Sequence, residues 1–408
     1  MTMEHCVIIG GSHAGAQLAT SLRQEGWKGR VSLIGAEPIL PYHRPPLSKA
    51  ALSGEKSDGD LLIRPADFYE KLQIDLILGS EVIAIDRGEK KVVLHDGGEI
   101  RYSKLALTTG AKVRKISIPG CELQGVCYLR GLGDVHQVRK HVGPGKSAVV
   151  IGGGYIGLES AASMRKMGMD VTVLEALPRV LERVTSHEIS AFYTRVHEEE
   201  GTRIITHATV ETIEGDKRVT GVRLADGRML PADVVLIGVG VLPATELAET
   251  AKLEVDNGIV VDEFARTCDH NIVAAGDCTN HFNPIYNKRF RLESVQNAND
   301  QAKIAAKTLC GKLVAYRTLP WFWSDQYDLK LQIAGISQGF DTVVLRGDTN
   351  TGRSFAAFYF SGDRLLAVDA INRPKEFMMA KRFLAEGKTA DPNKLADENV
   401  NTTEIFVD

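Results

Sequence analysis

The stretch VVIGGGYIGLESAASMRKMGMDVTVLE, residues 149–175, decides the fold of the chain. It opens with a short β-branched segment at residues 149–151, which predicts a strand. A helix-compatible run follows to Met167, and a second strand at residues 171–174 ends on Glu175. Between the first strand and the helix stand the three glycines of a GxGxxG motif: Gly152, Gly154 and Gly157. The order of these parts predicts one complete βαβ unit that binds a dinucleotide.

The spacing of the glycines explains how such a unit holds a cofactor. The first glycine makes a tight turn, the second lets the main chain approach a pyrophosphate, and the third lets helix and strand pack together. The helix N-terminus offers free N–H groups and the positive end of its dipole to the phosphates. Glu175 stands where a carboxylate bonds a ribose 2′-hydroxyl, and it would repel the 2′-phosphate of NADPH. We therefore expect an NADH site here rather than a plain glycine-rich turn.

The composition sets limits on the function. The 408 residues predict two or three domains, with 44% apolar and 25% charged residues as in an ordinary globular protein. A net charge of −3 gives no support to bulk nucleic-acid binding. We expect no signal peptide, and the longest apolar runs, such as residues 234–242, are too short to span a membrane. The six cysteines form no CxxC motif and no metal-ligand cluster, so we expect a reduced, cytoplasmic protein without a metal.

A second dinucleotide unit opens the chain, CVIIGGSHAGAQLATSLRQEGWKGRVSLIGAE at residues 6–37. Its strand leads into Gly10, and Gly15 completes the motif, but Ser12 occupies the place of the middle glycine. Serine adds a side chain where the backbone should approach a phosphate, although its hydroxyl can donate to that phosphate. After a helix and a second strand, Glu37 stands at the position of the ribose-binding acid. Two such units imply two dinucleotides: a flavin held permanently and a nicotinamide that comes and goes.

The sequence LPYHRPPLSKA, residues 40–50, predicts a stiff loop that carries Arg44 and Lys49. Its two consecutive prolines exclude a helix start before about Leu47. Two interpretations of the charges stay open. They belong to an ordinary solvated loop, or the lysine lies near a flavin, where a cation stabilises the reduced ring.

Two apolar strands in the middle of the chain end in similar glycine steps. The first, at residues 105–111, ends on Thr109 and Gly110, and the second, at residues 234–238, leads to Gly240. This internal similarity supports two related nucleotide domains. Before the first of these strands we expect an antiparallel meander formed by residues 76–78, 81–86 and 91–94.

The chain then returns to the first nucleotide domain. A strand at residues 272–275 is followed by Asp277, which belongs either to a common turn or to an acid held beside a ribityl chain. A long helix is expected at residues 292–311. The final section changes to alternating strands, where Trp321 and Trp323 are either core residues, the commoner case, or cofactor contacts. The elements expected there are residues 341–346, 355–360, 365–369 and 374–386, before a polar tail.

A series of motifs, in order along nearly the whole chain, matches one protein family. They are residues 10–15 with Glu37, 41–49, 109–111, 152–159 with Glu175, 267–277, 291–298 and 320–326. The chain resembles the FAD-dependent NADH:ferredoxin reductases of bacterial oxygenase systems, of putidaredoxin reductase type. The resemblance implies an α/β protein with two Rossmann-like dinucleotide-binding domains of glutathione-reductase type plus an α+β C-terminal domain. The expected domains are residues 1–113 with 245–319 for FAD, 114–244 for NADH and 320–408 at the C-terminus.

The resemblance also implies roles for single residues. Lys49 would lie close to flavin N5 with Arg44 near the same ring, and Glu159 would contact the nicotinamide amide. Tyr155 would cover the flavin until NADH displaces it, and Trp323 would stand beside the isoalloxazine. The other residues implied for FAD are Gly10, Ser12, Gly15, Glu37, Thr109, Gly110, Asp277, Glu293 and Val295. Those implied for NADH are Gly152, Gly154, Ile156, Gly157, Glu175 and Gly240.

One absence separates the chain from the disulfide reductases that share this fold. Those enzymes carry a redox-active cysteine pair or a single cysteine after the first βαβ unit, where this chain reads PYHR at residues 41–44. Electrons that reach the flavin therefore have no thiol relay. We expect hydride from NADH to enter at the flavin and single electrons to leave to a [2Fe–2S] ferredoxin, which feeds a Rieske dioxygenase or a cytochrome P450.

Two other functions remain open at this stage. A reductase of a small acceptor, such as a quinone, oxygen or monodehydroascorbate, would share every cofactor motif. A signalling flavoprotein would do so as well, although such proteins carry insertions that are missing here. If the partner is an acidic ferredoxin, a transient electrostatic contact is expected, and the alternative is ordinary solvated charge. The candidate docking cations are Arg64, Lys288, Arg289 and Arg291.

Overall fold

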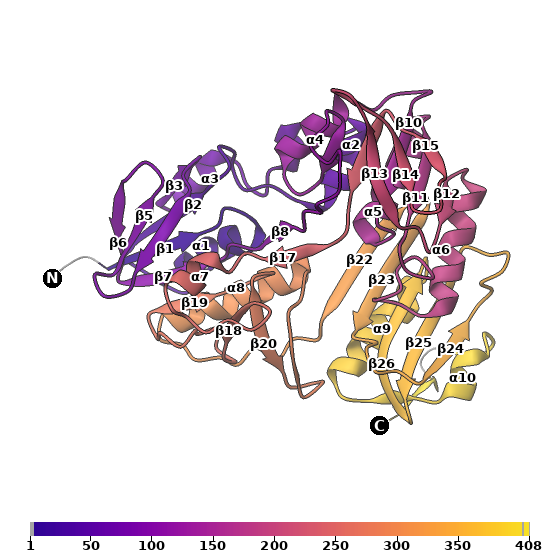
Figure 1. Ribbon diagram of the computed structural model, residues 1–408. Helices are drawn as coiled ribbons and strands as arrows, with labels where there is room; N and C mark the ends of the chain where they lie inside the picture. Colours follow the sequence, from indigo (N-terminus) through magenta and orange to yellow (C-terminus); the bar gives the residue numbers. More distant parts are fainter. Residues whose placement is uncertain (1–3, 402–403, 408) are drawn as a thin grey trace. The chain divides into compact units, whose positions relative to one another are not determined.

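The computed structural model describes residues 4–401 and 404–407, and the chain divides into two compact units. The first unit contains the chain up to His43, then Leu61–Lys112 and Leu242–Pro320. The second contains Arg44–Asp60, Val113–Val241 and the chain from Trp321 onward. Figure 1 labels many of their elements, and each unit is described by itself. The three domain boundaries expected from the sequence stay a prediction.

A parallel five-stranded sheet forms the centre of the first unit, with the strand order β19-β7-β1-β2-β3. Alternate side chains of β1 point to opposite faces of this sheet. Cys6 and Ile8 pack in one core with α1 and α8, while Val7 and Ile9 pack in another with the meander β4-β5-β6. The bounds are β1 (His5–Ile9), β2 (Arg30–Gly35), β3 (Ile74–Leu78), β7 (Lys104–Leu107), β19 (Ile272–Ala274), α1 (His13–Gln24) and α8 (Val295–Leu309).

The structure corrects the predicted meander. Residues 76–78 belong to β3, which pairs in parallel with β2 (Leu33 opposite Leu76) and is reached through the crossover helix α3. The true meander needs a third strand, β6, which is too short and too exposed to be recognised from its sequence. The bounds are α3 (Ala66–Lys71), β4 (Val82–Asp86), β5 (Lys91–Leu94) and β6 (Glu99–Arg101). Smaller elements of this unit are α7 (Glu246–Thr250), β18 (Ile259–Val261), β20 (Thr279–Asn283) and β21 (Lys288–Phe290).

The second unit contains a matching parallel sheet with the order β12-β11-β10-β16-β9. The predicted strands at residues 149–151 and 171–174 are confirmed, because they lie within β10 and β11. The bounds are β9 (Val126–Tyr128), β10 (Ser147–Ile151), β11 (Asp170–Leu174), β12 (Arg203–Ile205), β16 (Val234–Ile237), α4 (Leu132–Arg139), α5 (Tyr155–Lys166) and α6 (His187–Glu199). A small antiparallel sheet accompanies it, formed by β13 (Val210–Gly215), β14 (Val219–Leu224) and β15 (Met229–Pro231).

The C-terminal section adds an antiparallel sheet to the second unit, with the order β22-β23-β26-β25-β24. Its residues share one core with the nucleotide-binding sheet, because Leu331, Phe355 and Tyr359 pack in the same cluster as Val150 and Phe192. The bounds are β22 (Trp321–Gln326), β23 (Leu329–Gly335), β24 (Thr342–Arg346), β25 (Phe355–Ser361), β26 (Arg364–Ile371) and α9 (Pro374–Ala385).

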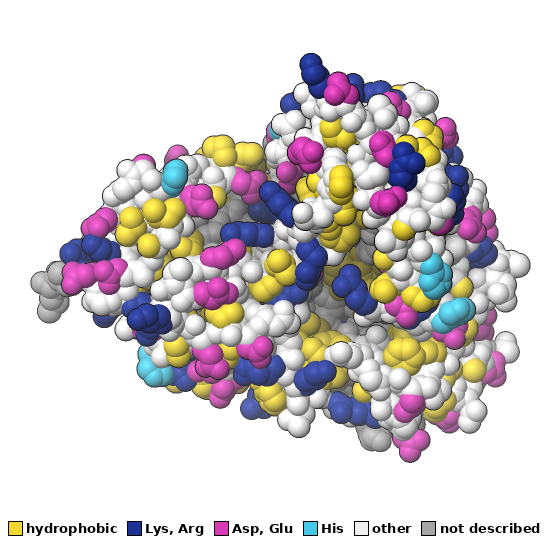
Figure 2. Space-filling view, in the orientation of Figure 1, with side chains coloured by type: hydrophobic (Ala, Val, Ile, Leu, Met, Phe, Trp, Pro, Cys, Tyr) yellow, Lys and Arg dark blue, Asp and Glu magenta, His cyan; other side chains and the backbone are white. Residues whose placement is uncertain are grey.

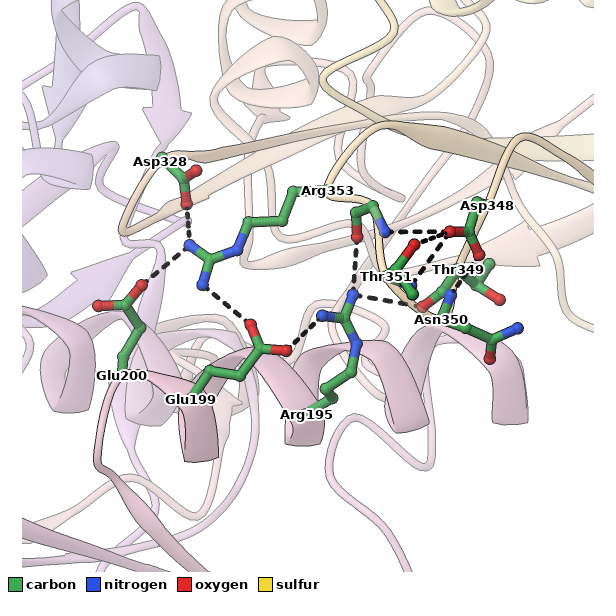
Figure 3. A network of polar contacts seen from close by, with 10 residues as sticks. Arg195, Glu199, Glu200, Asp328, Asp348, Thr349, Asn350, Thr351 and Arg353 are labelled. Carbon is green, nitrogen blue, oxygen red and sulfur yellow. Dashed lines mark hydrogen bonds and ion pairs between the residues drawn. The ribbon is translucent and has the colours of Figure 1, made fainter.

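A polar network ties α6 to the loops of this C-terminal sheet (Figure 3). Arg353 pairs with Glu199 at 3.0 Å, with Glu200 at 2.9 Å and with Asp328 at 2.7 Å. Arg195 pairs with Glu199 at 2.5 Å and donates to the backbone of the loop that carries Arg353. The network fixes the far end of α6 against two turns of the sheet.

Three element boundaries differ from the sequence expectation. A 3₁₀ helix, η1 (Pro45–Ser48), starts at the first proline, because a helix does not use the N–H groups of its first turn. The helix expected from residue 292 begins at Val295, where the hydroxyl of Ser294 accepts from the N–H of Asn297. The expected strand at residues 105–111 stops at Leu107, and Gly110 adopts φ +69°.

The expected polar tail is also structured where the chain is described. Asp391 caps α10 (Pro392–Ala396) by accepting from the N–H groups of Asn393 and Lys394, and Leu395 is buried. Two short strands, β27 (Thr389–Ala390) and β28 (Phe406–Val407), pair beside it. The remaining elements are η2 (Asp58–Leu61), α2 (Ala50–Ser53) and the paired β8 (Ala111–Val113) and β17 (Val241–Pro243). No helix in the described part of the chain is long and apolar enough to cross a membrane.

Candidate functional site

The glycine turn of the second unit has the form of a dinucleotide cradle. Gly152 adopts φ +111°, and a Cβ there would lie 2.4 Å from the carbonyl oxygen of Gly238. A Cβ on Gly157 would lie 2.0 Å from the carbonyl oxygen of Gly152, so the close packing of α5 on β10 needs glycine. A Cβ on Gly154 would meet no described atom within 4 Å. The middle glycine therefore faces open space at the N-terminus of α5, where a pyrophosphate would approach.

Glu175 is fixed at this turn. Its carboxylate accepts from the N–H of Gly153 at 2.8 Å and from the N–H of Leu177 at 2.9 Å. The loop after it folds back, because the N–H of Leu181 donates to the carbonyl of Gly153 at 3.0 Å. The acid at the end of β11 and the glycine turn thus form one rigid arrangement. Ile156, in the first turn of α5, is exposed beside it.

The first unit repeats the cradle. A Cβ on Gly10, which adopts φ +118°, would lie 2.1 Å from the carbonyl oxygen of Thr108, and a Cβ on Gly15 would lie 2.0 Å from that of Gly10. Ser12 is the N-cap residue of α1 with an extended backbone, as Gly154 is for α5. The turn therefore keeps its form with serine in the middle position.

Six further residues that the sequence suggested for FAD lie in this first unit, whereas Arg44, Lys49 and Trp323 belong to the second. Glu37 accepts from the hydroxyl of Tyr42 at 2.7 Å, and the hydroxyl of Thr109 donates to the carbonyl of Ala244 at 2.7 Å. Asp277 is half-buried and lies three residues after the end of β19. The remaining three are Gly110 at a positive φ, Glu293 just before α8 and Val295 as its first residue.

Lys49 and Glu159 meet inside the second unit. The Lys49 ammonium lies 2.6 Å from Oε2 of Glu159, and the Glu159 side chain is 3% exposed. The hydroxyl of Ser48 donates to the same carboxylate at 2.5 Å, and the hydroxyl of Ser324 donates to its other oxygen at 2.6 Å. Lys49 also donates to the carbonyl of Pro45 at 3.1 Å. A buried carboxylate with a cation and two hydroxyl donors is paired on both oxygens, which fixes the direction of the lysine.

Aromatic side chains accompany this pair. The ring of Tyr155 lies 5.0 Å from that of Phe322, and burial raises the pKa of Tyr155 well above its usual value. Trp321 and Trp323 stand 5.6 Å apart on β22, both half-buried, and the ammonium of Lys381 lies 4.5 Å above the Trp321 ring. The sequence expectation missed Lys381. Its only signal was a cation one helical turn after Phe377, a spacing that many solvated helices share.

Two predicted cofactor residues have other partners in this unit. The guanidinium of Arg44 donates to the carbonyl of Arg130 at 2.6 Å, so it fastens the 44–60 segment within the second unit. Gly240 adopts φ +100°, and its carbonyl accepts from the N–H of Arg114 at 3.0 Å. This bond adjoins the pairing of β8 with β17. Whether either residue also contacts a cofactor stays a prediction.

The predicted docking cations belong to the first unit and differ in availability. Arg291 pairs with Glu293 at 2.5 Å and is only 14% exposed, while Arg289 donates to two backbone carbonyls. Arg64, Lys288 and Arg289 are exposed. In the space-filling view, cations and anions are interspersed over the visible face (Figure 2). On the visible face, an acidic partner would depend on a local cluster of cations rather than on a surface of one sign.

The six cysteines form no disulfide with one another. All six are free, and Cys6, Cys127 and Cys278 are buried. Burial raises the pKa of Cys127 to about 11 and that of Cys6 further, so neither is a ready thiolate at neutral pH. The described residues form no group of three or more His, Cys, Asp or Glu that could hold a metal ion.

Comparison with known proteins places these features in a family. Residues 4–302 match the model of the pyridine nucleotide-disulphide oxidoreductases, and residues 321–406 match the reductase C-terminal model. Putidaredoxin reductase of Pseudomonas putida is 42% identical over 409 residues, which cover 99% of this chain and 97% of the relative. Rhodocoxin reductase of Rhodococcus erythropolis is 45% identical over 392 residues, which cover 96% of this chain and 92% of the relative. The crystal structure of the covalent putidaredoxin reductase–putidaredoxin complex matches with a TM-score of 0.95 at 42% identity, covering 98% of this chain and 97% of the other.

Proposed function

The chain belongs to the pyridine nucleotide-disulphide oxidoreductase family, among the ferredoxin reductases of oxygenase systems, and we propose that it passes electrons from NADH through FAD to a [2Fe–2S] ferredoxin. The ferredoxin would feed a Rieske dioxygenase or a cytochrome P450. The observation that carries this proposal is the ion pair of Lys49 with the buried Glu159, in a chain whose cysteines are all free. Bound FAD would supply the step between two-electron and one-electron chemistry.

The residues of the first unit fit FAD. Gly10 and Gly15 close a tight turn that no larger residue can replace, and the N-terminus of α1 faces the place of the pyrophosphate. Ser12 adds a hydroxyl at that N-terminus, which can donate to a phosphate oxygen. Glu37 and Asp277 stand after β2 and β19, at strand ends where carboxylates bond the hydroxyls of a ribose and a ribityl chain.

The second unit favours NADH over NADPH. The carboxylate of Glu175 is held at the glycine turn, where it can accept from ribose hydroxyls but would repel a 2′-phosphate. Arg179 is the first cation after it in the sequence, and its guanidinium is already used. It pairs with Glu182 at 2.6 Å and donates to the carbonyls of Thr185 and Ser186 at 3.0 Å. The guanidinium of Arg179 is therefore engaged within the loop.

Lys49 and Glu159 would orient the reacting groups. The ammonium of Lys49 is held by Glu159 and by the carbonyl of Pro45, so its position is fixed before any ligand binds. A fixed cation stabilises negative charge placed on a neighbouring bound ring without reorganisation. The carboxylate of Glu159 can accept from the carboxamide of a nicotinamide, which aligns that ring for transfer. Hydride transfer needs such alignment more than it needs an acid or a base.

Anaerobic titration separates the two halves of the proposed reaction. One equivalent of NADH should bleach the flavin absorbance of the purified holoenzyme, and two equivalents of oxidised [2Fe–2S] ferredoxin should restore it. NADPH should bleach the flavin much more slowly at the same concentration. If a quinone restored the absorbance far faster than several different ferredoxins, the enzyme would be a small-acceptor reductase instead.

A further inference from the structure

A continuous line of hydrogen bonds runs from Glu159 into the interior of the second unit. The hydroxyl of Ser324 lies 2.6 Å from Oε1 of Glu159, and Nε2 of Gln326 lies 3.2 Å from that hydroxyl. The amide oxygen of Gln326 lies 2.8 Å from Nε2 of His197. All four side chains are at most 3% exposed. Ser324 and Gln326 are two residues apart on β22, so they share one face of the strand.

The line continues beyond His197. The hydroxyl of Tyr327 lies 3.4 Å from Nδ1 of His197, and the hydroxyl of Thr202 lies 3.0 Å from that of Tyr327. His197 belongs to α6, so the line joins this helix, through the C-terminal sheet, to the acid on α5. Its six members lie in the same unit, together with Lys49.

Chemistry fixes the direction of each hydrogen bond between Glu159 and His197. A carboxylate only accepts, so Ser324 must donate its single proton to Glu159. Ser324 must then accept from the NH₂ group of Gln326, which leaves the amide oxygen of Gln326 to accept from His197. His197 is thereby held as the Nε2–H tautomer, with Nδ1 as an acceptor.

The surroundings of His197 keep its ring neutral. Burial lowers its pKa to about 4, although the hydrogen bond to Gln326 and the charge of Glu200 act in the opposite direction. With Nδ1 unprotonated, Tyr327 can donate to it and accept from Thr202. Every donor in the line then points toward the Glu159 carboxylate.

We propose that His197 is a positioning residue for the nicotinamide site, acting through Gln326 and Ser324 on the carboxylate of Glu159. The fixed tautomer holds the Ser324 hydroxyl on one oxygen of Glu159, and this leaves the other oxygen to Lys49 and Ser48. The inference rests on the proposed function only in assigning Glu159 to NADH. The direction of the hydrogen bonds does not depend on the electron acceptor.

A substitution that removes the charge of Glu159 tests the direction of the hydrogen bonds. In Glu159→Gln, Lys49 and Ser48 should hold the new amide oxygen, so its NH₂ group would point at Ser324 and reverse the line. His197 should then change from the Nε2–H to the Nδ1–H tautomer, which ¹⁵N chemical shifts of selectively labelled histidines distinguish. His281, equally buried but in the first unit, serves as the internal control and should not change. An unchanged His197 tautomer would overturn the proposed coupling.

Two substitutions at His197 test the effect on NADH. His197→Gln keeps a donor that can reach Gln326, whereas His197→Phe keeps the bulk and loses the donor. We expect His197→Phe to slow flavin reduction by NADH and to weaken NADH binding, each about five- to tenfold, and His197→Gln to stay within about twofold of the parent. Both readouts precede ferredoxin, so they hold even if the acceptor is another molecule. If the two variants behaved alike, His197 would have no positioning role and would only fill space in the core.

Discussion

At the scale of single residues, the role of Glu175 can be tested most directly. Glu175→Ala should lower kcat/KM for NADH about tenfold or more, because hydrogen bonds to a charged acceptor contribute about 1.5–3 kcal/mol. The value for NADPH should fall less or rise, since the repulsion of its 2′-phosphate is also removed. Steady-state kinetics with both coenzymes gives the ratio, and a melting curve checks that the loop still folds without the bond to Gly153. A ratio equal to that of the parent would remove Glu175 from coenzyme selection.

Asp369 makes stability depend on pH in a defined direction. It is buried, with Tyr359 and Thr185 donating to it, and burial raises its pKa to about 6. A raised carboxyl pKa contributes stability that is fully present below about pH 4 and is lost as the pH rises through 6. Between pH 5 and pH 7.5 the stability of the parent relative to Asp369→Asn should therefore fall by about 1 kcal/mol. Urea unfolding of both proteins at the two pH values measures this, and parallel profiles would contradict it.

The geometry around single residues was predictable where a local motif carries it, and their roles toward the cofactors stay predictions. Glu175 and the glycines follow from spacing alone, whereas Lys49 and Glu159 came from resemblance to a family. Their ion pair and the two serines around it could not be predicted, because Ser324 stands 165 positions from Glu159. Only the packing of β22 on α5 brings them together. The contact of the Lys381 ammonium with the Trp321 ring could not be predicted for the same reason.

At the scale of elements, Gly154 and Gly157 of the glycine turn at the expected NADH site should respond differently to replacement by alanine. Gly154 has an ordinary φ of −81° and open space around it, so Gly154→Ala should fold normally. Its methyl group would occupy the path of the pyrophosphate, and KM for NADH should rise about tenfold. Gly157→Ala places a Cβ 2.0 Å from a backbone oxygen and should destabilise the fold. Melting temperatures and NADH kinetics of the two variants test this prediction. An unchanged KM for NADH in Gly154→Ala would contradict the proposal that the pyrophosphate binds at this turn.

The network around Arg353 should stabilise the junction of α6 with the C-terminal sheet. Arg353→Ala leaves three carboxylates near one another, and we expect a loss of about 1–2 kcal/mol in unfolding free energy because the network is only partly screened by solvent. Lys71→Ala, which breaks an isolated exposed pair with Asp67, is the matched control and should change little. Urea titrations at low and high salt measure both. Equal effects of the two substitutions would mean that the network adds nothing beyond single surface pairs.

Element types followed from sequence periodicity, and their partners did not. The strand at residues 76–78 was expected in a meander, but its register with β2 places it in the parallel sheet. The two prolines were taken to delay a helix, although a first turn accepts them. The C-terminal residues were expected as a polar tail, because a helix as short as α10 has no periodic pattern and depends on its Asp391 cap. A long-range pairing decided the first case, the tolerance of a first helical turn for proline the second, and a single cap the third.

At the scale of the whole molecule, transfer to an acidic ferredoxin should weaken with salt. Lys381 on α9 carries its charge above Trp321, next to the tryptophan that resemblance assigns to the flavin. Lys381→Gln should raise KM for ferredoxin several-fold and reduce the salt dependence, while flavin reduction by NADH stays unchanged. Lys71→Gln, a cation on the first unit, is the control. Transfer that is insensitive to both salt and Lys381 would rule out electrostatic docking at this position.

The most direct test of the account is the dependence of NADH oxidation on a carrier protein. The holoenzyme is mixed with NADH and cytochrome c as the final acceptor, and the rate is measured with and without a [2Fe–2S] ferredoxin. The account predicts a low rate without ferredoxin and a large, saturable increase with it. Equal rates with and without every ferredoxin tested, together with fast direct reduction of a small acceptor, would contradict it.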